Sequence, residues 1–245
     1  YNGSAPGPEI RVRRGQLVQV TLVNEDIDDG VTIHWHGLDV PNAEDGVAGV
    51  TQNAVEPGGR YVYRFRPEQV GTFWYHTHQS SSAEVRRGLY GALVIEPPKR
   101  PRQELDLPVV VHTLDGIPLV NKTEGVERWR VTPGVEVRLR LVNTDSGPHR
   151  FDIGGSPFRV LAIDGTELNG PTPLSGRTLV LAAGGRYDVG FRMPEQPVRL
   201  SVEGTVAGGA VTVTANGVGE LVGVTIRSGE FDGSDPDDLS DLSDL

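Results

Sequence analysis

The sequence predicts an all-β protein that consists of two Greek-key β-sandwich domains. Short runs of Val, Leu, Ile and Thr lie between turn-forming segments, and the 245 residues include 32 glycines and 18 prolines. No segment has the 3.6-residue spacing of a long amphipathic helix. Two pairs of segments recur in the same order along the chain, which indicates that one sandwich is present twice.

The internal repeat has two parts. The segment Gly15-Gln-Leu-Val-Gln-Val-Thr-Leu-Val-Asn24 matches Gly134-Val-Glu-Val-Arg-Leu-Arg-Leu-Val-Asn143 at an offset of 119 residues. Further on, Gly58-Gly-Arg-Tyr61 matches Gly184-Gly-Arg-Tyr187 at an offset of 126 residues. Because the two matches keep their order, we expect the second half of the chain to repeat the fold of the first.

The strands and the boundary follow from the same segments. Apolar and polar residues alternate, so we expect strands at residues 17–23 and 135–141, each with one face in a core. Three prolines within residues 97–101 would interrupt strand pairing and indicate a boundary. The expected units are a first domain at 1–98, a linker at 99–106, a second domain at 107–228 and an acidic tail or linker at 229–245.

Charge and composition exclude several classes of protein. The net charge of −10 is concentrated in residues 229–245, which hold seven acids and no Lys or Arg. The other residues carry 26 acids and 23 bases, a balance that argues against nucleic-acid binding. No apolar run has membrane-spanning length, and no signal peptide is visible. Because there is no cysteine, this chain can form neither disulfides nor thiolate–metal bonds.

Two His-x-His pairs, His34-Trp35-His36 and His76-Thr77-His78, contain four of the six histidines. Residues i and i+2 of a strand share one face, so each pair can present two imidazoles roughly 6–7 Å apart. If the two strands are neighbours, four nitrogens converge, and imidazole suits Cu, Zn, Fe or Ni. The second copy of the repeat has no such pair, which makes a purely structural role less favoured. The pattern predicts a metal site.

Other candidate residues have structural interpretations. We expect Trp35 and Trp74 on the strand faces opposite the histidines, in packing roles. His112 lies in an apolar segment and is expected to be a hydrogen-bonded structural histidine. His149 falls near His34 in the repeat alignment, but a structural role is favoured over a vestige of an ancestral site. Residues 79–87 are expected to form a solvated loop.

The segments around the histidine pairs resemble the first cupredoxin domain of the multicopper oxidases, the laccase family. The matching motifs are His34-Trp-His-Gly-Leu38, Asp45-Gly46, Thr51-Gln52, Pro57-Gly58, Gly71-Thr-Phe-Trp-Tyr-His-Thr-His78 and Gly88-Leu-Tyr-Gly-Ala-Leu-Val-Ile95. Residues 107–228 resemble the copper-free second domain of that family. The resemblance implies that both sandwiches are cupredoxin-like.

The resemblance also implies a role for each site residue. His34 would be a ligand of the type 2 copper, His36 and His76 would bind one type 3 copper, and His78 would bind the other. Asp45 matches an acid near this trinuclear cluster that helps to deliver protons as dioxygen is reduced to water. The implied activity is the one-electron oxidation of a reducing substrate coupled to dioxygen reduction.

The departures from the family pattern limit what this chain can do alone. The family's third cupredoxin domain, which supplies four more cluster histidines and the Cys/His/His type 1 copper, has no counterpart here. Since the chain has no cysteine, no type 1 copper can form in it, and we expect it to be inactive by itself. The expected partner is a third domain, in cis or from another chain.

The sequence begins without Met, which suggests a piece of a longer protein, and the resemblance implies an extracytoplasmic location. Self-association through the uncovered ligand face is a further expectation.

Two alternatives remain open. The first is a non-catalytic cupredoxin pair that binds copper or acts as a scaffold. The second is a zinc hydrolase. The segment His34-Trp-His-Gly-Leu-Asp39 superficially resembles a His-x-His-x-Asp-His motif, but its acid is one position late and no histidine follows. Zinc hydrolysis is therefore the less favoured alternative.

Overall fold

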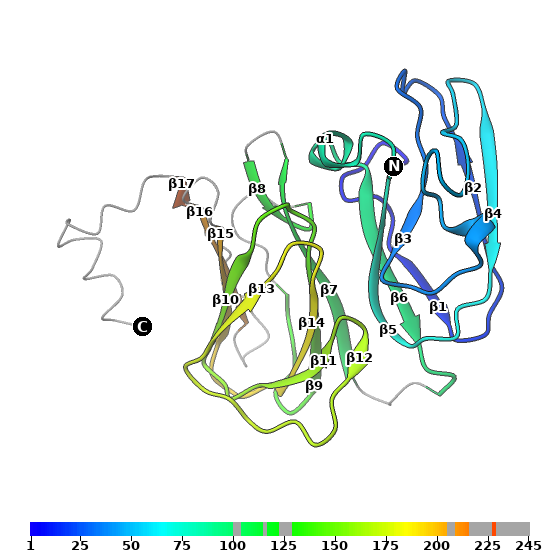
Figure 1. The fold of residues 1–245 in the computed structure, drawn as a ribbon. Coiled ribbons are helices and arrows are strands. Elements are labelled where there is room, and N and C mark those ends of the chain that lie inside the picture. Colours follow the sequence, from blue (N-terminus) through cyan, green and yellow to red (C-terminus); the bar gives the residue numbers. More distant parts are fainter. Residues whose placement is uncertain (100–103, 115–116, 123–128, 205–208, 216–226, 229–245) are drawn as a thin grey trace.

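The computed structural model describes residues 1–99, 104–114, 117–122, 129–204, 209–215 and 227–228 (Figure 1). Almost all of the regular structure in this part of the chain is β, in two sandwiches that lie side by side (Figure 1). The predicted all-β fold class is therefore confirmed. None of the described helices is long and apolar enough to cross a membrane.

The N-terminal sandwich contains the histidine pairs. Its elements are β1 (Ile10–Arg13), β2 (Val18–Val23), β3 (His34–His36), the 3-10 helix η1 (Asn42–Glu44), β4 (Arg60–Phe65), β5 (Gly71–His76), α1 (Ser81–Arg86) and β6 (Tyr90–Glu96). One sheet has the order β1-β6-β5-β3 and the other pairs β2 with β4. Trp35, Tyr63 and Phe73 are fully buried between the sheets, so the strand that carries His34 and His36 is anchored by its central tryptophan.

The C-terminal sandwich is larger. Its strands are β7 (Glu104–Leu114), β8 (Ile117–Val120), β9 (Glu136–Asn143), β10 (His149–Gly154), β11 (Arg159–Ile163), β12 (Thr166–Glu167), β13 (Thr178–Leu181), β14 (Arg186–Arg192), β15 (Val198–Gly204), β16 (Gly209–Ala215) and β17 (Arg227–Ser228). They form two sheets, in the orders β12-β11-β14-β9-β7-β8 and β13-β10-β15-β16-β17. Strands of the two sandwiches pair only within their own half, among the described residues.

The internal repeat is preserved in the pairing register. Strand β2 pairs with β4 so that Val23 is opposite Arg60, and β9 pairs with β14 so that Val142 is opposite Arg186. The two offsets in the sequence convert the first pair into the second. The asparagines at the strand ends, Asn24 and Asn143, exchange equivalent backbone hydrogen bonds with the glycine pair of their own copy. The repeated segments thus form the same strand pair and the same turn in both halves.

The two sandwiches pack against each other through a buried, mixed interface. Its apolar part is a cluster of six buried residues, Trp74, Val85, Tyr90, Ala92, Val110 and Val142. Its polar part centres on Thr72 of β5, whose hydroxyl donates to Asp188 Oδ1 at 2.5 Å and accepts from the Arg140 guanidinium at 2.8 Å. Because Thr72 and His76 belong to the same strand, the interface reaches the ligand-bearing strand directly.

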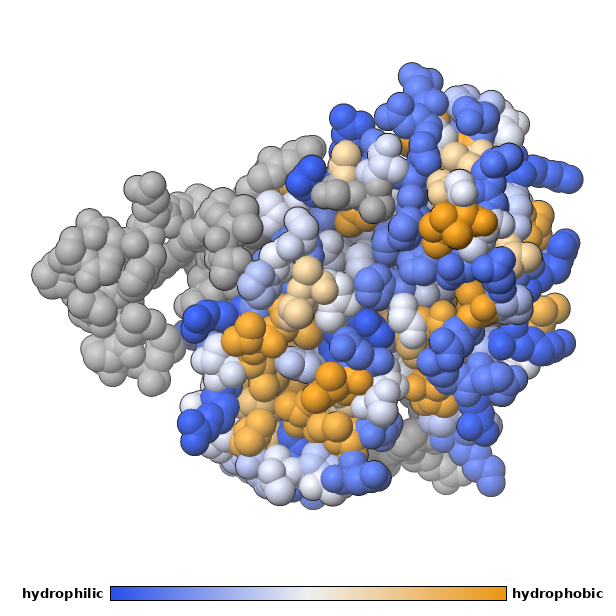
Figure 2. Space-filling view, viewed as in Figure 1, coloured by the Kyte–Doolittle hydropathy of each residue, from blue (hydrophilic) through white to orange (hydrophobic). Residues whose placement is uncertain are grey.

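The surface differs between the halves in the view of Figure 2. Polar side chains dominate the N-terminal sandwich, whereas apolar side chains gather over the region of β11 and β13. Ile163 of β11 and Val180 of β13 are among the exposed large hydrophobic residues.

Three expectations differ from the structure or lie outside it. Strand β7 begins at Glu104, within the expected linker 99–106, and pairs in parallel with β9. The solvated loop expected after His78 contains α1, and Glu84 on this helix is buried and paired with Arg87. The expectation was wrong for Glu84 because the helix packs against the interface, whereas Arg86 and Arg87 are exposed as expected. The acidic segment 229–245 lies outside the described residues.

Candidate metal centre

The two His-x-His pairs meet because β3 and β5 are antiparallel neighbours. His34 is directly opposite His76, and His36 is opposite Trp74. One ring nitrogen from each of His34, His36 and His76 lies within 4.8 Å of the other two. No other group of three His, Asp or Glu side chains in the described part of the chain is arranged in this way. The structure therefore brings together three of the four predicted ligands.

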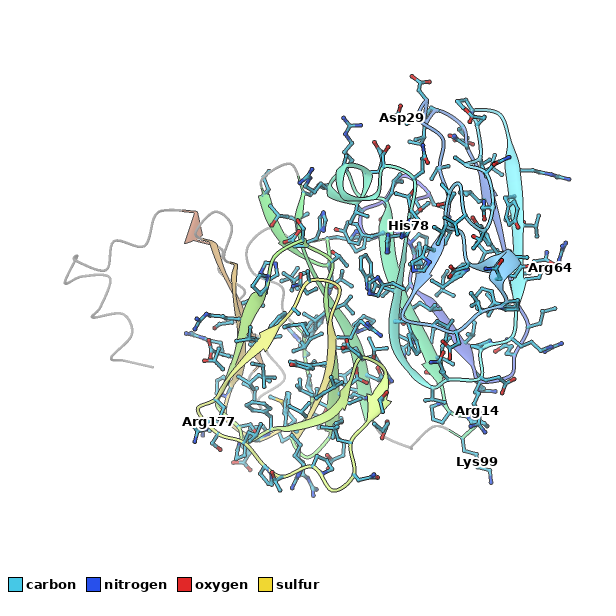
Figure 3. All side chains as sticks on the ribbon, viewed as in Figure 1. Arg14, Asp29, Arg64, His78, Lys99 and Arg177 are labelled. Carbon is cyan, nitrogen blue, oxygen red and sulfur yellow. The ribbon has the colours of Figure 1, made fainter. Side chains whose placement is uncertain are left out.

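His78 lies at the edge of this group. Its ring centroid is 5.1 Å from that of His34 and 6.0 Å from that of His76, but its side chain is exposed. The backbone amide of His78 donates to Thr32 Oγ1 at 3.0 Å, which ties the residue to the segment before β3. Figure 3 shows His78 near the end of β5, close to β3. A fourth imidazole is thus within reach of the group and open to a further ligand or partner.

Backbone carbonyls fix the orientation of two rings. His76 Nδ1 donates to the carbonyl oxygen of Thr77 at 2.7 Å, and His34 Nδ1 donates to the carbonyl oxygen of Asp45 at 2.9 Å. A carbonyl can only accept, so Nδ1 carries the hydrogen in both rings and the Nε2 lone pair is free. Metal-binding histidines are commonly held in this way by the nitrogen that does not bind the metal.

The donor set fits a metal that prefers nitrogen ligands. His76 Nε2 lies 3.4 Å from His36 Nδ1. Two nitrogens that each lie about 2.0 Å from one tetrahedral ion would be about 3.3 Å apart. Imidazole nitrogens without competing carboxylate ligands suit Cu or Zn rather than Mg or Ca. These residues therefore fit the copper that the family resemblance implies.

Burial keeps the two inner histidines neutral. Desolvation lowers the pKa of His36 to about 4, and the nearby Arg186 charge adds to this shift. Desolvation also lowers the pKa of His76 to about 3, against the effect of its hydrogen bond to Thr77. Neutral imidazole is the form that binds a metal. Both side chains are thus in the ligand form at neutral pH.

Asp45 lies beside the group, on a loop held against β3. Gly46 has φ +72°, and a Cβ at this position would overlap the carbonyl of Ile33. Trp35 Nε1 donates to the carbonyl of Glu44 at 2.8 Å, which fixes the same loop. Asp45 Oδ1 is 3.2 Å from His34 Nδ1, and its side chain is 30% exposed. Its predicted place near His34 is therefore observed, and its catalytic role stays a prediction.

Trp74 is closer to the site than expected. The prediction that it lies on the face opposite the histidines was wrong, because Trp74 and His76 are two residues apart on β5 and share a face. Its ring stacks on His36 at a centroid distance of 4.6 Å and on His76 at 4.3 Å. Trp35 does occupy the opposite face, where it is fully buried.

The C-terminal sandwich also reaches the site, which the sequence reasoning missed. Gly184 packs against the His36 ring, and the buried Arg186 lies beside Gly37, the residue after His36. The available signal was the repeated Gly-Gly-Arg-Tyr motif, but its pattern alone does not show that one copy faces the ligands. Arg186 Nε donates to the carbonyl of Thr72 at 3.1 Å and therefore binds β5 as well.

The remaining two histidines form a separate buried cluster. His112 Nδ1 is 2.8 Å from Thr144 Oγ1, in line with its predicted structural role, and it also lies 3.3 Å from Asp145 Oδ1. His149 Nε2 donates to Asp145 Oδ2 at 2.8 Å. Both histidines belong to the C-terminal sandwich, and neither joins the group on β3 and β5.

Comparison with known proteins identifies the family. Two family models, both described as multicopper oxidase, match residues 1–100 and 74–200, and the second match covers more than half of the chain. The chain belongs to the multicopper oxidase family. It is 32% identical over 218 residues to Laccase-1 of Botryotinia fuckeliana, a match that covers 77% of this chain and 38% of that protein.

Another relative matches a shorter part of this chain. Copper resistance protein A of Pseudomonas syringae pv. tomato is 45% identical over 95 residues, which is 39% of this chain and 15% of that protein. The chain spans roughly a third of the length of the first curated relatives it matches.

Solved structures give the same family assignment. A multi-copper oxidase from Pseudomonas thermotolerans is 34% identical with a TM-score of 0.72, over 82% of this chain and 54% of that chain. Blue Copper Oxidase from Nitrosomonas europaea is 26% identical with a TM-score of 0.74, over 88% of this chain and 77% of that chain. This chain shares the fold of these two oxidases, so the predicted cupredoxin-like type of β-sandwich is confirmed.

A further model, described as a YbaB/EbfC DNA-binding family, matches residues 192–243. Much of this stretch lies outside the described residues, and its described part contains the end of β14 and the strands β15, β16 and β17 of the C-terminal sandwich. The matched stretch contains nine acids and three arginines. Because DNA binding depends on neutralising phosphates with basic residues, this composition argues against DNA binding.

Proposed function

We propose that this chain provides half of the ligands of a trinuclear copper cluster in a multicopper oxidase, which couples one-electron oxidation of a reducing substrate to the reduction of dioxygen to water. The supporting observation is the convergence of His34, His36 and His76, with Nδ1 of two of these rings held by backbone carbonyls. His78 at the edge supplies the fourth nitrogen. The family assignment supports copper as the metal.

Each ligand has an assignment under this proposal. His36 and His76, whose nitrogens are 3.4 Å apart, would hold one type 3 copper. His34 would hold the type 2 copper, and the exposed His78 would hold the other type 3 copper. Copper bound there would supply one-electron redox chemistry, and four electrons with four protons convert one dioxygen to two waters. The incomplete set on this chain leaves room for ligands from a second module.

Asp45 has a role in proton supply under the same proposal. Its carboxylate is near His34 and partly exposed, so it can exchange protons with solvent and hold one at the edge of the site. Reduction of dioxygen to water consumes protons as well as electrons. A carboxylate that both solvent and the cluster can reach would deliver them.

Electron entry requires a domain in addition to the two sandwiches of this chain. The chain has no cysteine, so a type 1 copper with a thiolate ligand has to come from elsewhere. We infer that the partner is a third cupredoxin domain, in cis or from another chain, that covers the exposed His78 and completes the cluster. The reducing substrate would then bind near that domain. An extracytoplasmic location is part of the proposal, on family grounds.

The test uses the natural gene product that contains this chain. Copper content and oxygen uptake with a phenol as reductant are measured for the wild type and for His36→Gln, His76→Gln and His112→Gln. We expect the first two variants to lose copper and oxygen uptake, and we expect His112→Gln to keep copper. Oxygen uptake that does not depend on His36 and His76 would refute the proposal.

A second outcome would favour the non-catalytic alternative. If the wild type binds copper at these histidines and consumes no oxygen with phenols or oxidisable metal ions, the function is copper binding or scaffolding. Zinc-dependent esterase activity in place of copper binding would instead support the hydrolase alternative.

A further inference from the structure

We propose that the turn formed by residues 182–186 of the C-terminal sandwich is a positioning element for His36 and His76, although it contributes no metal ligand. This inference rests on the proposed copper function and deepens it. It assigns a role in the site to the half of the molecule that has no His-x-His pair. Three contacts support it, one each from Gly184, Trp74 and Arg186.

The first contact is between Gly184 and the His36 ring. Gly184 is buried and has φ +69°, and a Cβ at this position would lie 2.9 Å from His36 Cε1 and 3.0 Å from Nε2. Real Cβ contacts essentially never fall below 3.0 Å, so only glycine fits without a shift. The backbone of the C-terminal sandwich therefore closes one side of the His36 ring and restricts how it can turn.

The second contact passes through Trp74. Its indole ring stacks on both His36 and His76, and its Nε1 donates to the carbonyl of Gly184 at 3.3 Å. The buried indole is thus held from the C-terminal sandwich and in turn packs against both histidines. A shift of the turn would move the indole and, with it, the two rings assigned to one copper.

The third contact comes from Arg186, which is 5% exposed. Its guanidinium donates to the carbonyls of Thr72 on β5 and Gly184 in the turn, at 3.1 and 3.2 Å. Gly37, the residue after His36, faces the guanidinium, and a Cβ there would overlap it. Arg186 therefore hydrogen-bonds the turn to β5 and packs against Gly37 at the end of β3.

The internal repeat shows that this arrangement is not a general property of the motif. The equivalent residues of the first copy are Gly58 and Arg60, with the same register and the same glycine backbone conformation at φ +78°. Both are exposed, and a Cβ at Gly58 would meet nothing within 4 Å. Only the second copy of the turn contacts the histidines, so the first copy is a control within the same molecule.

The experiment compares Gly184→Ala with Gly58→Ala. Both variants place a side chain on a left-handed backbone, so they share that strain, and only Gly184→Ala adds an atom against His36. We expect Gly184→Ala to shift the His36 and His76 ring signals in NMR spectra of the metal-free chain. We also expect it to weaken Cu(I) binding by about 10–100-fold, the range typical of residues that orient ligands. Gly58→Ala should change neither.

A second pair of variants covers the case in which Gly184→Ala does not fold. Trp74→Phe keeps a ring between the histidines and removes the bond to the Gly184 carbonyl. Arg186→Ala is matched by Arg60→Ala, and Arg186→Lys tests whether charge alone suffices. We expect Trp74→Phe and Arg186→Ala to move the His36 signals, Arg60→Ala to leave them unchanged, and Arg186→Lys to rescue incompletely.

The outcomes separate the two proposals. Equal effects of Gly184→Ala and Gly58→Ala on the His36 signals and on Cu(I) affinity would overturn the positioning role. Ring signals that move in Gly184→Ala while Cu(I) affinity stays unchanged would overturn it as well. A wild-type chain that binds no copper would instead overturn the proposed function, and the ring signals of the metal-free variants would still report whether the turn holds His36.

Discussion

His34 and His76 face each other as direct partners on antiparallel strands, with ring centroids 5.4 Å apart. This pairing fixes the register of the two His-x-His pairs along the neighbouring strands β3 and β5. Since side chains alternate between the faces of a strand, a slip of one residue would move one pair to the opposite face. The buried Trp35 opposes such a slip, because it would have to leave the core. The same packing that stabilises the sandwich therefore sets the geometry of the site.

The pH dependence of stability should report the buried histidines. The pKa of His36 is lowered to about 4 and that of His76 to about 3, whereas an unfolded histidine titrates near 6.5. Between these values the unfolded chain binds protons that the folded chain does not, so stability rises with pH in this window. We expect these two histidines to make their full contribution to the free energy of unfolding of the metal-free chain above about pH 6.5. The free energy of unfolding should fall as the pH drops toward 4.

The check is urea unfolding at several pH values in the presence of a chelator. The double variant His36→Gln and His76→Gln should show a smaller slope between pH 6.5 and 4 than the wild type. An unchanged slope in this variant would contradict the assignment of the pH dependence to these two side chains.

Gly46 should be much less tolerant of substitution than its neighbour Gly49. Both have a left-handed backbone, with φ +72° and +77°, but only Gly46 lies against the carbonyl of Ile33. We expect Gly49→Ala to cost about 1–2 kcal/mol from the backbone alone. Gly46→Ala should cost about 3 kcal/mol or more, because overlap in a packed region adds to that strain. Denaturant unfolding of the two variants measures the difference, and equal costs would show that the loop can move away from β3.

Asp188 should be a main point of attachment between the sandwiches. It is 1% exposed at its side chain and accepts hydrogen bonds from Thr72, Arg138 and Arg140. Removing one partner of a buried charge network typically costs about 3–5 kcal/mol. We expect Asp188→Ala to lose stability of this order in denaturant unfolding. Glu167→Ala is the control, because this acid pairs with Arg138 at the surface and should cost at most about 1 kcal/mol.

Asp45→Asn should separate metal binding from proton supply. The backbone carbonyl of Asp45 contacts His34 Nδ1 and survives the substitution, so the His34 ring should keep its orientation. We expect copper affinity to change by less than about tenfold, below the roughly 10–100-fold loss typical of residues that orient ligands. Oxygen uptake by the natural gene product should fall by a larger factor. Loss of copper in step with oxygen uptake would assign Asp45 to ligand positioning alone.

Much of the site could be predicted from the sequence because its signals are local. The i, i+2 spacing of two histidine pairs defines a shared face. The repeat predicted that the second half copies the fold of the first, and β2–β4 and β9–β14 share one register. The prediction for Trp74 was wrong because it rested on the position of this residue beside the His76-Thr77-His78 pair rather than on its spacing of two from His76. The local pattern contained the answer.

The contributions of the C-terminal sandwich could not be predicted in the same way. Gly184 and Arg186 look like Gly58 and Arg60 in sequence, and only the packing of one sandwich on the other buries the second set. The early start of β7 has a similar origin. Residues 104–106 form strand because they pair with β9, a contact between segments more than 30 residues apart.

The measurement that tests the central claim most directly is a titration of the metal-free chain with Cu(I), which is diamagnetic, while the ring signals of all six histidines are followed by NMR. We predict that the signals of His34, His36, His76 and His78 shift with added copper and that those of His112 and His149 do not. Histidine signals that stay unchanged, or shifts confined to His112 and His149, would contradict a copper site on β3 and β5.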